Sequence, residues 1–200
     1  MQKPLHIALV GFMGSGKSAV GRCLAQKLNI PFVDLDRVIE MECGQKVADI
    51  FQEHGEVGFR ARERAALRHV LEQEESMVIA TGGGTFIDPA MRAAIKKDSR
   101  TIYLRADIAS LASRLEQAGE IACRPLLVGP DPRATIKRLM RERSGAYLEC
   151  EHSVSTDGED VDKVAERIHV WLESSPAQAP RRQLSIDAQR GSYPIEIRPN

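Results

Sequence analysis

The chain has 200 residues, 42% of them hydrophobic, which is enough for one domain with a substantial core. Its 28 lysines and arginines balance 28 aspartates and glutamates, so no net charge favours nucleic acid or an anionic membrane. Aromatic residues make up only 4%, too few for the stacking surfaces that bind single-stranded nucleic acid. We therefore expect no nucleic-acid partner and no membrane partner.

The cysteines and histidines argue against a zinc site and against an oxidising compartment. The four cysteines are far apart in the sequence, and the five histidines lack the spacing of metal ligands. The apolar run at the N-terminus is short and lacks a cleavage signal, so we expect no signal peptide. A cytoplasmic protein with reduced thiols is the simplest interpretation.

A phosphate-binding loop follows the first predicted strand, residues 5–10. Residues 11–18, Gly-Phe-Met-Gly-Ser-Gly-Lys-Ser, match the pattern G-x-x-x-x-G-K-[ST], and a helix is predicted over residues 18–28. In such loops backbone N–H groups surround a phosphate, the lysine reaches the β- and γ-phosphates, and the hydroxyl binds Mg²⁺. The nucleotide contacts are expected at Gly14, Ser15, Gly16, Lys17, Ser18 and Ala19.

Short apolar segments alternate with amphipathic ones along the rest of the chain. This alternation predicts βαβ units and a parallel sheet covered by helices on both faces. Further strands are predicted at residues 31–35, 77–80, 101–104 and 152–155, and helices at 38–41, 47–54, 59–73, 90–96, 108–118, 132–142 and 161–173.

Two acidic residues lie at the end of the second predicted strand. Asp34 and Asp36 are two residues apart, so in a strand their side chains share a face. One is expected to hold Mg²⁺ through water while the other meets the hydroxyl groups of an acceptor. The alternative is that both aspartates cap the following helix.

Arginines and glycines later in the chain suggest an anionic acceptor. Arg60, Arg62 and Arg64 crowd a predicted helix start, where the helix dipole disfavours cations unless an anion binds nearby. Such a cluster is more often a solvated face. Gly82, Gly83 and Gly84 follow the third predicted strand, where they allow either a tight turn or close approach of a substrate to the backbone.

Residues 118–132 interrupt the alternation with glycines and prolines, and we predict a mobile lid there. Arg124 within it is positioned to close on phosphates, and Arg143, beyond the next helix, to pair with a carboxylate. Either arginine is equally consistent with an ordinary surface residue.

Together these motifs resemble the shikimate kinase family over about residues 5–173. They include the glycine loop, Asp34-Leu-Asp36, Phe59-Arg-x-x-Glu63, Gly82-Gly-Gly84, Arg124-Pro-Leu-Leu127 and Arg143-x-x-x-Tyr147. The resemblance implies a P-loop fold like that of nucleoside-monophosphate kinases, with a five-stranded parallel sheet of order 2-3-1-4-5 and a closing lid. It implies Mg²⁺- and ATP-dependent phosphorylation of the 3-hydroxyl of shikimate, within aromatic amino acid biosynthesis.

The resemblance also implies roles for individual residues. Shikimate would be bound by Asp36, Arg60, Gly82, Gly83 and Arg143; Lys17 and Arg124 would contact the nucleotide phosphates; Ser18 would bind Mg²⁺ directly and Asp34 through water; and Arg114 would pack on adenine. Lys17, Asp36 and Arg124 would be the catalytic residues, in a kinase domain expected to be monomeric. The chain departs from the family at Ala19, where threonine is common, and at Gly145, where proline is usual.

The composition changes near residue 174, so we assign residues 1–174 to the kinase domain and 175–200 to a linker and tail. Residues 184–197 alternate apolar and polar residues, as a pair of strands would. Residues 190–197 weakly resemble the opening strand of 3-dehydroquinate synthase. The tail is therefore predicted to be the start of a fused second enzyme, or an extension left from such a fusion.

Three rival functions follow from the same residues. A kinase for another polyol acid, such as gluconate or an amino analogue of shikimate, would also use paired arginines. A binding domain without catalysis is disfavoured because Lys17, Ser18, Asp36 and Arg124 occur together. A GTPase switch is set aside because the sequence has neither Asn-Lys-x-Asp nor Asp-x-x-Gly.

Overall fold

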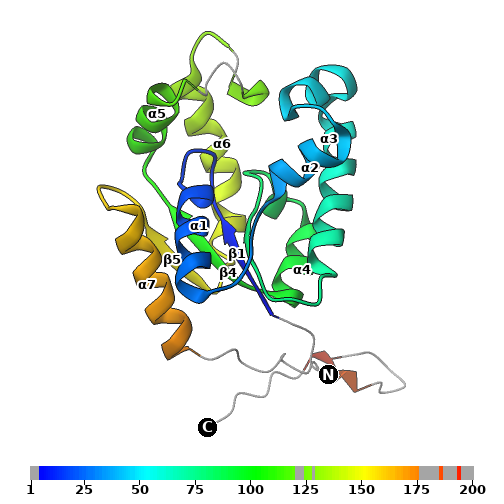
Figure 1. Ribbon diagram of the computed structural model, residues 1–200. Coiled ribbons are helices and arrows are strands. Elements are labelled where there is room, and N and C mark those ends of the chain that lie inside the picture. The colour runs from blue at the N-terminus through cyan, green and yellow to red at the C-terminus, as the bar shows by residue number, and fades with distance from the viewer. Residues whose placement is uncertain (1–4, 120–123, 128, 176–184, 187–192, 195–200) are drawn as a thin grey trace.

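The computed structural model describes residues 5–119, 124–127, 129–175, 185–186 and 193–194. A five-stranded parallel sheet of order β2-β3-β1-β4-β5 lies at its centre (Figure 1). The predicted α/β fold and strand order are thus confirmed. The strands are β1 His6–Val10, β2 Phe32–Asp34, β3 Val78–Ala80, β4 Ser99–Arg105 and β5 His152–Ser155. The helices are α1 Lys17–Leu28, α2 Leu35–Cys43, α3 Val47–Leu71, α4 Pro89–Asp98, α5 Ile108–Gln117, α6 Pro132–Tyr147 and α7 Val161–Ser174, with 3₁₀ helices η1 Thr85–Ile87 and η2 Pro125–Leu127.

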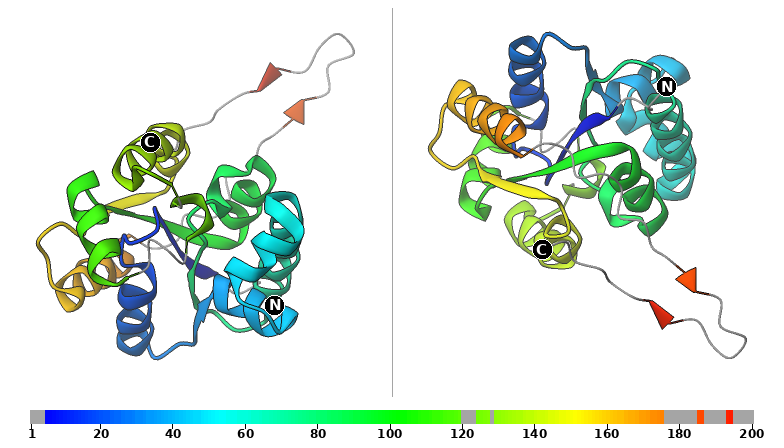
Figure 2. Two further views of the ribbon diagram at one scale, coloured as in Figure 1. Left: turned by 90° about the horizontal axis from the view of Figure 1, so that it is seen from above. Right: turned by 90° about the horizontal axis from the view of Figure 1, so that it is seen from below.

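The central strand β1 divides the hydrophobic core into two layers. All five of its residues are buried, as expected for a parallel strand covered on both faces. Because successive side chains point to opposite faces, Ala8 and Val10 join the cluster under α3, α4 and α6, while Ile7 and Leu9 join the cluster under α1 and α7. Figure 2 shows α1 and α7 side by side on one face of the sheet and α4 and α6 on the other.

Three of the predicted helix assignments change most in the structure. The helix α2 begins at Leu35 rather than Val38, because Asp34 ends β2 and caps the helix. The two helices predicted over 47–54 and 59–73 are joined in α3 across a kink at Gly55, whose φ of 64° and ψ of −175° lie outside the helical region. The helix α6 continues to Tyr147, so the prediction that Arg143 follows this helix is wrong.

The predicted lid and tail are only partly described. Within the lid, residues 120–123 and 128 lie outside the described residues, while η2 is formed and Leu127 is fully buried. Most of the predicted linker, and residues 190–192 and 195–197 of the tail match, also lie outside them. Two short antiparallel strands, β6 Ser185–Ile186 and β7 Tyr193–Pro194, occur where a strand pair is predicted. Within the described ranges, no helix is long and apolar enough to cross a membrane.

Candidate active site

The glycine loop connects β1 to α1 at the carboxyl edge of the sheet. Gly14 and Gly16 have φ of 78° and 92°, a backbone conformation that residues other than glycine rarely adopt. Gly16 is also the N-cap of α1, and no side chain caps the helix there. The first N–H groups of α1 and its positive dipole end are therefore directed toward the loop, which suits a bound phosphate.

Lys17 lies inside this loop. Its Nζ donates hydrogen bonds to the carbonyl oxygens of Gly11, at 2.9 Å, and Phe12, at 2.8 Å. Burial lowers the pKa of Lys17 to about 8, and the nearby carboxylate of Asp36 opposes that shift. At neutral pH the lysine is therefore mostly protonated, with a smaller preference for the charged form than a lysine in water has.

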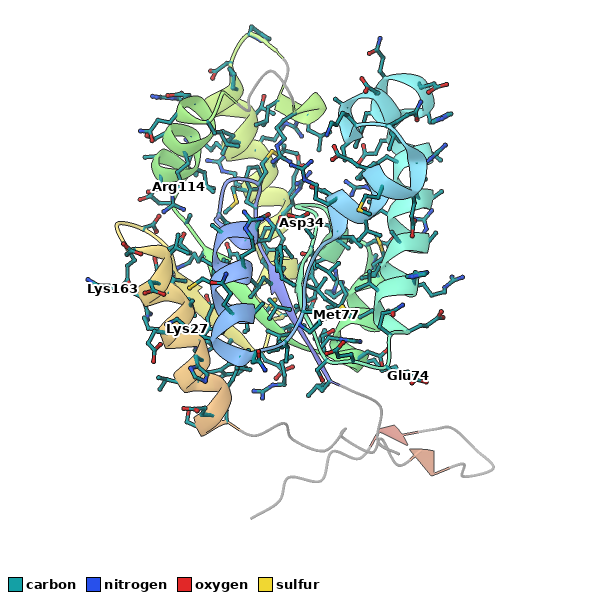
Figure 3. The ribbon with its side chains drawn as sticks, viewed as in Figure 1. Lys27, Asp34, Glu74, Met77, Arg114 and Lys163 are labelled. Atoms are coloured by element: carbon teal, nitrogen blue, oxygen red, sulfur yellow. The ribbon has the colours of Figure 1, made fainter. Side chains whose placement is uncertain are left out.

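Ser18 and Asp34 form an oxygen pair next to Lys17. Ser18 Oγ donates to Asp34 Oδ2 at 2.5 Å, and Figure 3 shows Asp34 at the level of the start of α1. A hydroxyl and a carboxylate fit Mg²⁺, which takes oxygen ligands and draws most of them from water and phosphates. No group of three or more His, Cys, Asp and Glu side chains in the described ranges is placed to hold a metal.

The two aspartates do not share the face of a strand, contrary to the sequence prediction. Asp34 is the last residue of β2, whereas Asp36 lies in the first turn of α2. The backbone N–H of Asp36 donates to Asp34 Oδ1 at 3.2 Å, so Asp34 caps the helix. The alternative interpretation, that both aspartates cap it, is thus confirmed for Asp34 and is wrong for Asp36. Asp34 therefore combines the cap with the contact to Ser18.

Asp36 lies near both Lys17 of the glycine loop and Arg124 of the predicted lid. Its Oδ2 is 3.8 Å from Nη1 of Arg124, and 32% of its side chain remains exposed. Burial, and then the like charge of Asp34, raise the pKa of Asp36 to about 6, although Arg124 acts in the opposite direction. A carboxylate with this pKa is a suitable proton acceptor near neutral pH.

Of the three clustered arginines, Arg60 is the one held inside the site. Its Nη1 donates to Glu63 Oε2 at 2.6 Å, and its Nη2 donates to Glu56 Oε1 at 3.1 Å. Glu63 is fully buried and also accepts a bond from Thr85 Oγ1 at 2.6 Å. Arg64 instead pairs with Asp88 at the surface, as the solvated-face interpretation expected for this cluster.

The glycine triplet at residues 82–84 runs between the arginines. A Cβ on Gly82 would lie 3.2 Å from Asp36 Oδ1, and a Cβ on Gly84 would lie 2.7 Å from Arg60 Nη1. The carbonyl oxygen of Gly83 accepts a hydrogen bond from Arg143 Nη1 at 3.2 Å. The triplet therefore allows the backbone to approach the charged side chains more closely than other residues would permit.

Arg143 extends from α6 back to the glycine loop. Only 7% of the residue is exposed, and its guanidinium carbon lies 5.6 Å from the centre of the Phe12 ring. Phe12 is also the residue whose carbonyl accepts from Lys17. Arg143 thus contacts both the triplet and the loop that carries Lys17.

Arg114 of α5 lies on the other side of the glycine loop. It donates to the carbonyl oxygen of Gly14 at 3.4 Å and to the hydroxyl and carbonyl oxygens of Thr156 at 3.0 and 2.5 Å. Figure 3 shows Arg114 beside α5. These bonds hold the guanidinium group beside the glycine loop.

Sequence reasoning gave no role to Glu63 or Thr156. Glu63 had a usable signal, because its i,i+3 spacing from Arg60 places the two side chains together on one helix. Thr156 had none, since it follows β5 and meets Arg114 only through the folding of the sheet.

A comparison with protein-family models identifies the family of this fold and site. The model described as "Shikimate kinase" matches residues 13–173. The chain belongs to the shikimate kinase family. Curated shikimate kinases from Francisella tularensis subsp. novicida and Symbiobacterium thermophilum are 36% and 41% identical to it, over 86% and 82% of this chain and 97% and 94% of theirs.

Solved structures agree with the family assignment. A shikimate kinase from Acinetobacter baumannii, in complex with shikimate, matches this shikimate kinase family member with a TM-score of 0.81 and 31% identity, over 88% of this chain and 96% of that one. The shikimate kinase from Bacteroides thetaiotaomicron matches with a TM-score of 0.77 and 33% identity, over 84% and 98%. The APS kinase of Mycobacterium tuberculosis, at 18% identity and a TM-score of 0.54 over 85% of this chain and 99% of that one, shares the fold alone.

Proposed function

We propose that this chain transfers the terminal phosphoryl group of ATP to the 3-hydroxyl group of shikimate, giving shikimate 3-phosphate and ADP. The observation that supports this most directly is that Arg124 lies 3.8 Å from Asp36. Both residues are near enough to Lys17 to shift its pKa, Asp36 upward and Arg124 downward. Phosphoryl transfer needs cations that stabilise charge on the transferred group, here Lys17 and Arg124, and a group that orients the attacking hydroxyl, here Asp36. Relatives named shikimate kinase, and one bound to shikimate, support the choice of acceptor.

In this proposal two arginines beside the glycine triplet bind the carboxylate of the acceptor. Arg60 and Arg143 supply guanidinium groups that pair with a carboxylate in the two-pronged geometry that lysine cannot reproduce. Gly82 and Gly83 let the ring of the acceptor approach the backbone. Asp36 accepts a hydrogen bond from the acceptor hydroxyl and then its proton as the new bond to phosphorus forms.

The donor is held by the glycine loop. The backbone of residues 14–19 and the side chain of Lys17 bind the phosphates, Arg124 approaches them from the lid, and Arg114 packs against adenine. Ser18 would hold Mg²⁺ directly and Asp34 would hold it through water; when bound, this ion neutralises charge on the phosphates. Closure of the lid over residues 118–132 would exclude water from the reacting groups.

Purified protein should be tested with Mg²⁺, ATP and a panel of acceptors: shikimate, gluconate and an amino analogue of shikimate. Release of ADP is measured with coupled enzymes, and the product is identified by mass and phosphorus NMR. We expect activity with shikimate that is lost in Lys17→Ala. Preference for gluconate would contradict the proposed acceptor, and no turnover with any acceptor would favour a binding domain without catalysis.

We further propose that residues 1–174 form a monomeric kinase domain that works in the cytoplasm, and that residues 175–200 begin a fused second enzyme or remain from one. The hydrophobic clusters lie within residues 7–172, and the described cysteines Cys23, Cys43 and Cys150 are free thiols. A chain truncated after residue 175 should keep full activity and elute as a monomer in light-scattering chromatography. Loss of activity on truncation would contradict this division.

A further inference from the structure

Tyr147 ends α6 with a buried hydroxyl that the proposed chemistry does not use. The residue is 1% exposed, and its ring lies 5.2 Å from that of Tyr103 in β4. Its hydroxyl donates a hydrogen bond to the carbonyl oxygen of Gly83 at 2.5 Å. The hydroxyl of a core tyrosine thus reaches the turn that faces the acceptor, 64 residues away in the sequence.

Arg143 donates to the same carbonyl oxygen. Arg143 and Tyr147 are four residues apart in α6, so their side chains lie on one face of the helix, one turn apart. A carbonyl oxygen has two lone pairs and accepts both bonds, from Arg143 Nη1 at 3.2 Å and from the hydroxyl of Tyr147. The position of Gly83 therefore depends on both residues, and the position of Arg143 depends on Gly83.

The hydroxyl remains a donor at every pH at which the enzyme would work. Burial raises the pKa of Tyr147 to about 12, with only partial opposition from the positive charge of Arg143. The bond to Gly83 therefore does not titrate between about pH 6 and pH 9. Its effect on binding should be constant across this range, unlike the effects of Asp36 and Lys17.

We propose that Tyr147 is a positioning residue for acceptor binding: through Gly83 it holds the glycine triplet and the Arg143 guanidinium where the acceptor carboxylate meets them. This inference rests on the proposed function. Tyr147 does not touch the acceptor and takes no part in proton transfer. Without the Tyr147 hydroxyl, the Gly83 carbonyl oxygen accepts one hydrogen bond instead of two. The glycine triplet is then held less firmly, and so is the Arg143 guanidinium that bonds to it.

The test compares Tyr147→Phe with Tyr103→Phe and with the unchanged enzyme. Both substitutions remove one hydroxyl from the same pair of buried rings, but only Tyr147 bonds to the triplet. We expect Tyr147→Phe to raise the KM for shikimate about five- to tenfold, because binding must then order the Gly83 carbonyl and Arg143, a cost limited to about that of one hydrogen bond. The KM for ATP should stay within about twofold. Tyr103→Phe should leave both constants within about twofold.

A cycle with Arg143→Lys tests whether Tyr147 acts through Arg143. The increase in shikimate KM caused by Tyr147→Phe should be smaller in the Arg143→Lys enzyme than in the unchanged one. Equal effects in both backgrounds, an unchanged shikimate KM, or a parallel rise in the KM for ATP would each overturn the inference. An increase in shikimate KM that varies between about pH 6 and pH 9 would also overturn it.

Two controls keep this result distinct from other failures. Circular dichroism melting curves establish that each variant is folded at the assay temperature, and the comparison is repeated in a Gly145→Ala background, in which the last turn of α6 is reinforced. An unchanged enzyme that releases no ADP with shikimate would overturn the proposed function and this inference with it. An active unchanged enzyme with an unaffected Tyr147→Phe variant would overturn the inference alone.

Discussion

Arg124 and Asp36 face one another, with Nη1 of the arginine 3.8 Å from Oδ2 of the aspartate, although 88 positions separate them in the sequence. The pair joins the lid to the acceptor side of the proposed site. One residue is expected to stabilise charge on the transferred phosphoryl group, and the other to take the proton of the attacking hydroxyl. Their proximity also makes the pKa of Asp36 depend on Arg124.

Replacing Arg124 with alanine should change both turnover and its pH dependence. Turnover should fall on the order of 100-fold or more, as it does when other transition-state donors are removed. Since Arg124 lowers the pKa of Asp36, its removal should also raise that pKa, and the acidic limb of kcat/KM should move to higher pH. Steady-state kinetics across pH measures both effects. Near-normal turnover, or an acidic limb displaced to lower pH, would count against these roles.

The unchanged enzyme should show a bell-shaped dependence of kcat/KM for shikimate on pH. Below about pH 6 the carboxylate of Asp36 becomes protonated and no longer accepts the hydroxyl proton, since its pKa is raised to about 6. Above about pH 8 Lys17 loses its charge, because burial lowers its pKa to about 8. The profile of kcat/KM reports the free enzyme, so these are the groups expected to appear in it. A profile that stays flat from about pH 5 to pH 7 would contradict the role of Asp36.

Asp36→Asn should stabilise the fold while removing activity. The folded pKa of about 6 lies above the value of 3.8 for the free side chain, so the folded state binds more protons between these values. Stability contributed by the protonated form is present at low pH and is lost as pH rises through about 6. At about pH 7.5 the asparagine avoids the cost of keeping a partly desolvated carboxylate ionised beside Asp34, and the melting temperature should rise. At about pH 4 the two proteins should melt at similar temperatures; a lower melting temperature for the variant at both values would refute the argument.

Gly84→Ala should weaken acceptor binding specifically. A Cβ at this position would lie 2.7 Å from Arg60 Nη1 and 2.8 Å from Arg60 Cζ, so the guanidinium group must move. Because the end of an arginine side chain is flexible, we expect a rise of about tenfold in the KM for shikimate, with little change in the KM for ATP. Gly145→Ala is the matched control, since a Cβ there meets nothing within 4 Å. Equal kinetics for the two variants would mean that Arg60 does not depend on Gly84.

The sequence predicts most of the fold because its signals are local. Buried strands such as β1, and the glycines before Lys17, impose their conformation over a few residues. The candidate site residues are predicted from similar short motifs. Their arrangement is harder to predict, because Asp34 ends its strand early to cap α2 and Arg143 remains within a helix that continues past its polar stretch.

Contacts between distant segments require the folded sheet. Arg124 meets Asp36, and Tyr147 meets Gly83, only after β1, β3 and β4 pair and bring α6 against the triplet. No spacing within one segment carries this information, because each contact joins elements whose relative position depends on the packing of the whole core. The sequence therefore indicates the chemical groups of the proposed site, while the fold determines which of them act on one another.

Gly145→Ala should stabilise the protein and preserve acceptor binding. Glycine inside a helix costs about 0.5–1 kcal/mol relative to alanine, because the unfolded chain has more freedom to lose. Gly145 lies in α6 between Arg143 and Tyr147, and a Cβ added there meets nothing within 4 Å. Its replacement should therefore raise the free energy of unfolding by about that amount without moving either neighbour.

Urea denaturation measures this gain, and Gly158→Ala supplies the contrast. A Cβ at Gly158 also meets no atom within 4 Å, but its φ of 66° is one that alanine rarely adopts. We therefore expect Gly158→Ala to lower the free energy of unfolding, while Gly145→Ala raises it with the shikimate KM unchanged or lower. If Gly145→Ala destabilises the protein or raises that KM, the glycine serves to let the last turn of α6 bend, and the rigid placement of Arg143 and Tyr147 argued above would be wrong.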